Sequence, residues 1–253
     1  MHQTSIKNQL ENYPRLYLAT LSLKRIGHWS RKWIVSKTSD ITIEGYPRSG
    51  NSFAHSAFRS AQGETKYRIA THVHSHAQII RSVQLGVPTM VLLREPKAAA
   101  LSLVALSKEI AERELSEADK KRSKCTLMQN LEDYTRFYEH VYEVHQGVII
   151  ADFNLVTRDF GQIIERVNHR FGTRFAIYKN TEAQDKELFD SGGFHLSPNQ
   201  KRDSIKDQIR RCFDDPEVMQ LAKEATAIYE NMLVVEQEQA KRHSLHPQPA
   251  ARV

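Results

Sequence analysis

The sequence has few cysteines and no long apolar run. Only Cys125 and Cys212 occur among the 253 residues, and their spacing is not that of metal ligands. A disulfide-held scaffold is therefore excluded, and the composition suits a reducing compartment. No stretch of about 18 consecutive apolar residues is present, and Met1 to Leu10 is polar. We therefore expect neither a membrane span nor a signal peptide, and a cytoplasmic location.

The sequence also lacks internal repeats and the composition of a disordered chain. Hydrophobic residues make up 40% and charged residues 26%, close to the globular norm. A chain of this length can form one large domain with a substantial core. We expect that domain at residues 41–236, preceded by a basic helical segment, 1–40, packed on it. Residues 237–253, with two prolines and little apolar content, are expected to be a disordered tail.

The net charge of +6 would suit an anionic ligand, a nucleic acid or a membrane surface. Residues 14–35 interleave leucine, isoleucine and tryptophan with lysine and arginine, as in a basic amphipathic helix. Contact with a membrane surface is one interpretation, but we expect this helix to dock on the core. No recognised nucleic-acid-binding module is visible, so no nucleic-acid partner is expected.

Short apolar runs alternate with helical patterns along the chain. The expected strands are 41–45, 67–72, 88–93 and 147–153, and the expected helices are 52–61, 77–85, 97–108, 127–144, 160–171 and 204–235. This alternation predicts an α/β fold, with a central parallel sheet and helices on both faces. Ligands of such sheets bind at the carboxyl ends of the strands.

One of those strand ends carries a recognisable loop. The residues from Gly45 to Ser52 read Gly-Tyr-Pro-Arg-Ser-Gly-Asn-Ser, which fits the G-x-x-x-x-G-K-[ST] pattern except that Asn51 replaces the lysine. The N–H groups of such a loop and of the helix that follows hold phosphate. The missing lysine normally reaches the β and γ phosphates of a triphosphate. The loop therefore predicts an anion-binding site that lacks the lysine needed to bind the β and γ phosphates of a triphosphate. Arg48, inside the loop, would supply the positive charge of this site.

The segment from Tyr46 to Ser52 resembles the 5′-phosphosulfate loop of sulfotransferases that use 3′-phosphoadenosine 5′-phosphosulfate (PAPS). Arg94 is followed eight residues later by Ser102, and this pair looks like the family's 3′-phosphate pair. A guanidinium can offer paired donors to phosphate. Thr71-His72-Val73 looks like the Thr-His-Leu segment that carries the family's catalytic histidine. The resemblance covers residues 41–175.

The resemblance implies a sulfotransferase-like fold of the P-loop nucleotide-binding type. It implies transfer of a sulfuryl group from PAPS to the hydroxyl of a small-molecule or carbohydrate acceptor, leaving adenosine 3′,5′-bisphosphate, with no metal. His72 would be the general base, and Arg48 would stabilise charge on the bridging oxygen. The residues expected to bind the co-substrate are Arg48, Ser49, Gly50, Asn51, Ser52, Phe53, Arg94 and Ser102.

The sequence departs from the family at two places. Ala70 stands where cytosolic members often carry a lysine, and the family's C-terminal Arg-Lys-Gly loop is absent as such. The segment from Ser197 to Arg202 is the nearest substitute. Its Lys201 and Arg202 either complete the 3′-phosphate site or form an ordinary basic surface at the start of a helix.

Three alternatives remain at this point. A P-loop kinase or hydrolase would use ATP and Mg²⁺, but Asn51 and the lack of a clear Asp at the end of 88–93 count against it. A metal site is the second alternative, because His72, His74 and His76 would share one face of an extended strand. No carboxylate or cysteine lies near them in the sequence to complete such a site. A non-catalytic basic binder of nucleic acid or membrane is the third.

The acceptor is not specified by the sequence, and neither is the oligomeric state. Four aromatic residues at 134–194 either line an acceptor pocket or belong to the core. They are Tyr134, Phe137, Tyr138 and Phe194.

Overall fold

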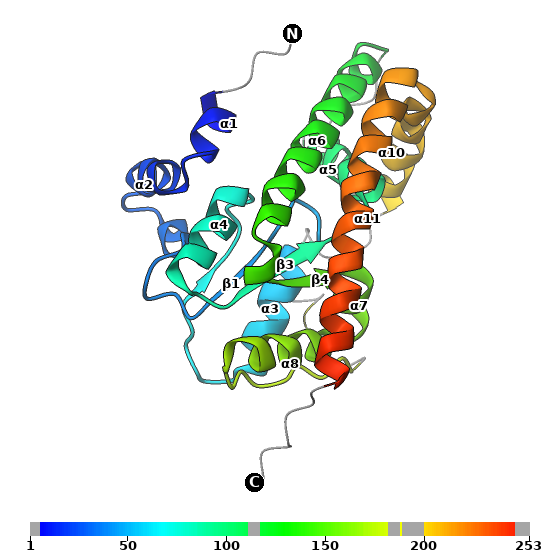
Figure 1. Ribbon diagram of the computed structural model, residues 1–253. Helices are drawn as coiled ribbons and strands as arrows, with labels where there is room; N and C mark the ends of the chain where they lie inside the picture. Colours follow the sequence, from blue (N-terminus) through cyan, green and yellow to red (C-terminus); the bar gives the residue numbers. More distant parts are fainter. Residues whose placement is uncertain (1–5, 111–116, 182–187, 189–199, 246–253) are drawn as a thin grey trace.

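A four-stranded parallel sheet forms the centre of the computed structural model, which describes residues 6–110, 117–181, 188 and 200–245 (Figure 1). The strand order is β2-β1-β3-β4. The strands are β1 (Ile41–Gly45), β2 (Ile69–Ala70), β3 (Thr89–Leu93) and β4 (Ile149–Asp152). Thr42 lies opposite Ala70 on one side and Thr89 on the other, which fixes the register of the three neighbours.

Strands β1 and β3 are buried along their whole length because helices cover both faces of the sheet. Val91 and Leu93 face one hydrophobic cluster, whereas Met90 and Leu92 face the other. This alternation is the period of two that side chains follow along a strand. The predicted α/β class, a central parallel sheet with helices on both faces, is confirmed.

The two faces carry different helices. The first cluster receives α4 (His76–Leu85), α5 (Pro96–Ile110), α6 (Glu117–Glu143) and α11 (Pro216–Leu245), and the second receives α3 (Asn51–Ala61) and α8 (Phe160–Phe171). Figure 1 shows the two longest helices, α6 and α11, running side by side. Gly86 and Gly172 end α4 and α8 in the left-handed conformation, which glycine adopts without steric cost.

The N-terminal part is helix, turn and short 3₁₀ helix rather than the single amphipathic helix expected over 14–35. It contains α1 (Ile6–Glu11), α2 (Pro14–Lys24) and η1 (Trp29–Trp33), with Gly27 at φ 76° between the last two. Leu18 of α2 packs in a third cluster with Val35, Ala70 and Val87. The N-terminal elements are therefore anchored to β2 and α4.

The C-terminal part differs from the sequence prediction in its boundaries. The helix expected over 204–235 is two helices, α10 (Gln200–Arg210) and α11, separated by η4 (Arg211–Asp214) and by Pro216 at the first position of α11. The disordered tail was expected from Gln237, but α11 continues to Leu245. Within that stretch the Gln239 amide accepts from Ile150 N and donates to Val148 O. The boundary expected at residue 236 is therefore too early, and the rest of the expected tail, residues 246–253, lies outside the described residues.

Two further helical segments were not predicted. Helix α6 begins at Glu117, within the charge-rich stretch expected as a solvated face or loop, and a short helix α7 (Phe153–Arg158) follows β4. Asp152 caps α7 by accepting a hydrogen bond from Asn154 N. Among the described residues, no helix has both the length and the apolar character needed to span a bilayer.

Candidate active site

The strand order creates a topological switch point at the carboxyl ends of β1 and β3, and we call this place the crevice. From β1 the chain continues into α3 on one face of the sheet, and from β3 it continues into α5 on the other. Adjacent loops that leave in opposite directions define the switch point at which open α/β sheets bind ligands. The loop from Tyr46 to Gly50 and the turn at Arg94 lie at this point.

The loop after β1 ends in a helix N-terminus that can hold an anion. Gly50 is the N-cap of α3 at φ 92°, and the first helical hydrogen bond runs from Ala54 N to Gly50 O. The N–H groups of Asn51 and Ser52 precede that bond and have no carbonyl within the helix to donate to. A Cβ on Gly50 would come within 3.3 Å of the Phe153 ring, so the residue must be small here.

Asn51, which occupies the lysine position of a triphosphate loop, closes this loop from inside. Its side chain is buried, and Nδ2 donates to Tyr46 O at 3.0 Å. Its Oδ1 has no hydrogen-bond partner among the described residues. Asn51 therefore stabilises the loop, whereas a lysine at this position would extend a positive charge toward a bound nucleotide.

The structure brings Arg48, Arg94 and Ser102 together, as the sequence predicts. Arg48 Nε donates to Ser102 Oγ at 3.0 Å, and Arg94 Nη1 donates to Arg48 O at 2.7 Å. The Arg94 guanidinium also lies over the Phe153 ring, 4.1 Å from its centroid. Burial lowers the pKa of Arg94, but an arginine keeps its charge in proteins. Two cations and a hydroxyl therefore meet at the crevice.

Tyrosines of α6 hold the carboxyl end of β3. Tyr134 OH donates to Arg94 O at 2.6 Å, and Tyr138 OH donates to Leu92 O at 2.7 Å. Burial raises the pKa of both phenols, so they stay protonated as donors. The rings of Tyr134 and Tyr138 belong to the core, whereas Phe137 packs in the same cluster and also lines a small cavity of about 160 Å³. Phe194 lies outside the described residues.

His72 lies next to the helix N-terminus, as expected from its place between the two loops. Its Nε2 is 3.4 Å from Ser52 Oγ, and its Nδ1 is 2.9 Å from Thr71 Oγ1. Its ring packs against Trp33, with centroids 4.9 Å apart. The contact to Ser52 connects the predicted base to the anion loop.

Backbone strain gathers at the same edge of the sheet. Arg48, His72 and His74, at φ 69°, 52° and 54°, are the residues other than glycine with positive φ in the described chain. Arg48 lies three residues after the end of β1, and His72 and His74 lie two and four residues after the end of β2. Side chains with a Cβ rarely adopt this conformation, and such strain concentrates at functional sites.

Sequence reasoning missed Glu44, which organises the loop that carries His72. Its carboxylate is fully buried and accepts hydrogen bonds from Val73 N at 2.9 Å and from Gln78 Nε2 at 3.0 Å. His74 Nδ1 lies 3.4 Å from the same carboxylate and 3.0 Å from Gly45 O. The available signal was a lone acidic residue in an otherwise apolar strand, since buried carboxylates need such partners.

The proposed alternation of His72, His74 and His76 on one strand is wrong. These residues lie beyond β2, and His76 begins α4, where it stacks on His140 at 4.2 Å between ring centroids. Burial, with His140 as a smaller contributor, lowers the pKa of His76 to about 3. Among the described residues, no three His, Cys, Asp or Glu side chains are grouped to hold a metal.

Three other expected ligand residues lie differently from the cluster at the crevice. The Phe53 side chain is in the core against Phe160 and Tyr178, so only its backbone belongs to the loop. Lys201 and Arg202 are in the first turn of α10, and their side chains fall outside those described. Ser197 also lies outside the described residues.

Comparisons with known proteins add little to this geometry. A scan of protein-family models and a search of curated proteins each return no match for this sequence. Among solved structures, the mouse sulfotransferase SULT7A1 in complex with PAP aligns with a TM-score of 0.47 and 14% sequence identity. The alignment covers 89% of this chain and 95% of the mouse chain. Similarity at that level does not carry a ligand or a residue role from one chain to the other.

Proposed function

We propose that this chain is a PAPS-dependent sulfotransferase that transfers a sulfuryl group to the hydroxyl of a small-molecule or carbohydrate acceptor. One observation supports the proposal: the loop from Tyr46 to Ser52, the Arg94/Ser102 pair and His72 meet at the switch point of the sheet. They come from three separate strand ends, and hydrogen bonds link Arg48 to Arg94 and to Ser102, while Ser52 contacts His72. An anion bound there would face two guanidinium groups and a helix N-terminus.

In this proposal the N–H groups at the start of α3 hold the 5′-phosphosulfate, and Arg94 with Ser102 holds the 3′-phosphate. Ser102 Oγ accepts a hydrogen bond from Arg48 Nε. A hydroxyl that accepts one bond keeps its own proton as a donor. Ser102 can therefore serve Arg48 and a phosphate oxygen together. Arg48 stabilises the charge that develops on the bridging oxygen as the S–O bond to the leaving phosphate breaks.

His72 is the proposed base. In the tautomer with the proton on Nδ1, the Nδ1–H group donates a hydrogen bond to Thr71 Oγ1. Nε2 is then an acceptor next to Ser52. Nε2 then takes the proton of the acceptor hydroxyl as its oxygen bonds to sulfur. The Trp33 and His55 rings pack on His72 and also line a cavity of about 440 Å³. We assign the acceptor to this cavity.

The test is a thermal shift and calorimetric titration with adenosine 3′,5′-bisphosphate, compared with ATP plus Mg²⁺. At about a hundred times its dissociation constant the bisphosphate should stabilise the fold by about 2.7 kcal/mol. Ser102→Ala and Arg94→Lys should each weaken binding, by about tenfold for a lost hydrogen bond to a charged group. Arg174→Ala, an exposed arginine beyond the end of α8, is the matched control and should bind normally.

His72→Asn separates binding from chemistry. This variant should bind the bisphosphate with unchanged affinity but lose sulfuryl transfer from PAPS to phenolic or sugar acceptors by at least a hundredfold. A larger stabilisation by ATP with Mg²⁺ than by the bisphosphate would return the loop to the kinase class. No bisphosphate binding, or full transfer activity in His72→Asn, would overturn the assigned roles.

A further inference from the structure

Helix α2 is apolar on the side that faces away from the protein. Leu18 and Tyr17 point inward to the third cluster, whereas Leu16 and Leu23 are 55% and 67% exposed. Seven residues make about two turns, so these two leucines share one outward face. The other exposed residues of α2 are Arg15, Ala19 and Lys24, so the two leucines lie on an outward face with a cation near each end. We therefore expect the outward face of α2 to be covered by a binding partner.

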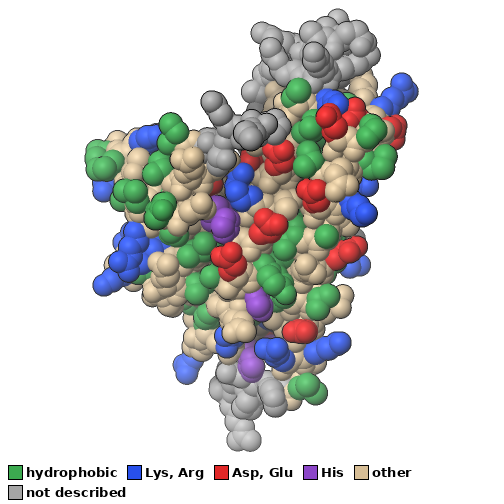
Figure 2. All heavy atoms as spheres, turned by 45° about the horizontal axis from the view of Figure 1, so that its top comes forward, with side chains coloured by type: hydrophobic (Ala, Val, Ile, Leu, Met, Phe, Trp, Pro, Cys, Tyr) green, Lys and Arg blue, Asp and Glu red, His purple; other side chains and the backbone are tan. Residues whose placement is uncertain are grey.

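Exposed apolar side chains continue along the chain on either side of these leucines. Tyr13, Ile26 and Trp29 are 67%, 63% and 60% exposed. Figure 2 shows hydrophobic and basic side chains together on the left of the molecule, where Figure 1 places α2, and shows the visible acidic side chains mostly toward the middle and right. Tyrosine and tryptophan are the residues enriched where protein meets the polar boundary of a bilayer.

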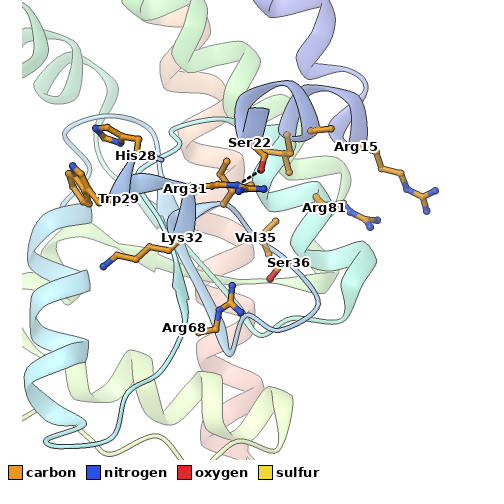
Figure 3. A pocket seen from close by; sticks show the side chains of 13 residues that line it. Arg15, Ser22, His28, Trp29, Arg31, Lys32, Val35, Ser36, Arg68 and Arg81 are labelled. Carbon is orange, nitrogen blue, oxygen red and sulfur yellow. Dashed lines mark hydrogen bonds between the residues drawn. The ribbon is translucent and has the colours of Figure 1, made fainter. Parts of the chain in front are cut away.

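A basic groove adjoins this apolar face. A cavity of about 740 Å³ is lined by five cations from α2, η1, α4 and the segment before β2: Arg15, Arg31, Lys32, Arg68 and Arg81. Figure 3 shows Arg15 and Arg81 reaching out in the same direction, and Arg31 held by its hydrogen bond to Ser22. In the described part of the chain, none of these five forms an ion pair with a carboxylate. Among the described residues, the Asp40 carboxylate hydrogen-bonds only to the backbone N–H of Arg68, at 2.7 Å, so the five side chains of the groove form a concentration of positive charge.

The local sequence carries the same charge. Between Glu11 and Asp40 there is no acidic residue, while Arg15, Lys24, Arg25, Arg31, Lys32 and Lys37 supply six cations. Lysine or arginine near an anionic lipid surface contributes about a fivefold gain in partitioning, equivalent to about 1 kcal/mol. A segment with leucine and aromatic side chains beside unpaired cations matches a helix that lies in the membrane interface.

We propose that this N-terminal face, formed by α2, η1 and the basic groove, docks on an anionic lipid bilayer. The leucines of α2 and Trp29 enter the boundary between headgroups and acyl chains, and the cations of the groove contact lipid phosphates. Charge complementarity selects this occupant. A second copy of the chain would bring two positive faces together, and a nucleic acid would leave the exposed leucines in water. This proposal does not depend on the reaction at the crevice.

The experiment is co-sedimentation of the full chain with vesicles. Vesicles of phosphatidylcholine and phosphatidylglycerol at about 3:1 should bind the chain, whereas pure phosphatidylcholine should bind it weakly, and raised salt should weaken binding. Leu16→Gln with Leu23→Gln should reduce partitioning at least tenfold. The matched control, Met219→Gln with Val234→Gln, alters two α11 side chains that are each 54% exposed and should bind normally.

The cation half is tested in the same way. Arg15→Gln with Arg81→Gln should reduce partitioning roughly 25-fold, from about fivefold per cation. Lys223→Gln with Lys241→Gln on α11 is the control. Equal binding to neutral and anionic vesicles, loss of binding in the control pairs, or a concentration-dependent dimer in sedimentation that is abolished by the leucine changes would overturn the proposal. So would competition by inorganic phosphate at millimolar levels, which would indicate a soluble-anion site.

Discussion

Gly50 shows how one residue constrains the anion loop in two independent ways. Its φ of 92° is unfavourable for any residue with a Cβ, and the added atom would approach the Phe153 ring, which also supports Arg94. Arg48 adopts a similar backbone angle without being glycine. The backbone of the loop is therefore strained at Arg48 but not at Gly50, where glycine adopts the positive φ without steric cost. The hydrogen bonds around the loop keep both residues in this conformation.

We expect Gly50→Ala to lower the free energy of unfolding by about 1–3 kcal/mol, from backbone strain and the contact with Phe153. Gly63→Ala is the matched control, because Gly63 has φ +56° but nothing lies within 4 Å of its added Cβ. Chemical denaturation measures both. If Gly50→Ala lowers the free energy of unfolding no more than Gly63→Ala does, the contact with Phe153 does not contribute to the destabilisation.

At the scale of the element, α6 serves as the support of the site. Its tyrosines hold the carbonyl groups at the end of β3, and Tyr46 OH reaches back to donate to Asn130 O at 2.8 Å. The helix thus fixes the position of the β3 end and of the loop after β1 from one side. Stability of α6 and geometry of the crevice are therefore coupled.

Removing one of these hydroxyls should affect both properties. Tyr134→Phe leaves the Arg94 carbonyl without its donor, so we expect a loss of about 1–2 kcal/mol in stability. Bisphosphate affinity should also fall several-fold, because Arg94 is less well positioned. Tyr142→Phe, a 40% exposed tyrosine of the same helix, is the control for both measurements. Unchanged affinity in a destabilised Tyr134→Phe would mean that α6 does not position Arg94.

The elements also show where sequence reasoning succeeds and where it stops. Local chemistry predicts β1, β3, the loop between β1 and α3, and the caps at Gly86 and Gly172, because turn residues and apolar runs determine these directly. It misses Glu44 and the break between α10 and α11. The role of Glu44 depends on Val73 and Gln78, which are distant in sequence. The outward leucines of α2 are equally invisible from the helical pattern alone, since the pattern does not say which side the core takes.

At the scale of the whole molecule, buried neutral histidines make stability depend on pH. Burial lowers the pKa of His76 from 6.5 to about 3 and, with Arg59 and Lys32 as lesser causes, that of His55 to about 4. Above pH 6.5 these groups are neutral in both the folded and the unfolded chain. Below it the unfolded chain binds protons that the folded chain does not. Stability is therefore lost between pH 6.5 and about 4, where His55 begins to titrate in the fold, and His76 continues the loss to about pH 3.

His76→Phe should reduce by one the number of protons that the unfolded chain binds in excess of the folded chain. Each such proton contributes a slope of up to about 1.4 kcal/mol per pH unit, so the variant should show a shallower fall in stability between pH 6 and 4. The measurement is urea denaturation across that range, with His76→Gln as a second variant that keeps a polar side chain. A slope equal to the native one in both variants would contradict the assignment of His76 as a buried neutral base.

The amide of Gln239 has a consequence for the edges of the sheet. Within the described part of the chain β4 is an edge strand of the sheet, and an outward row of backbone groups on such a strand is a template for a strand from another molecule. Gln239 offers a carbonyl to Ile150 N and an N–H to Val148 O, which imitates one residue of a fifth strand. A single side chain near the C-terminal end of α11 thus occupies the two backbone groups at the start of β4 that an added strand would use, and it ties the last turns of α11 to the sheet.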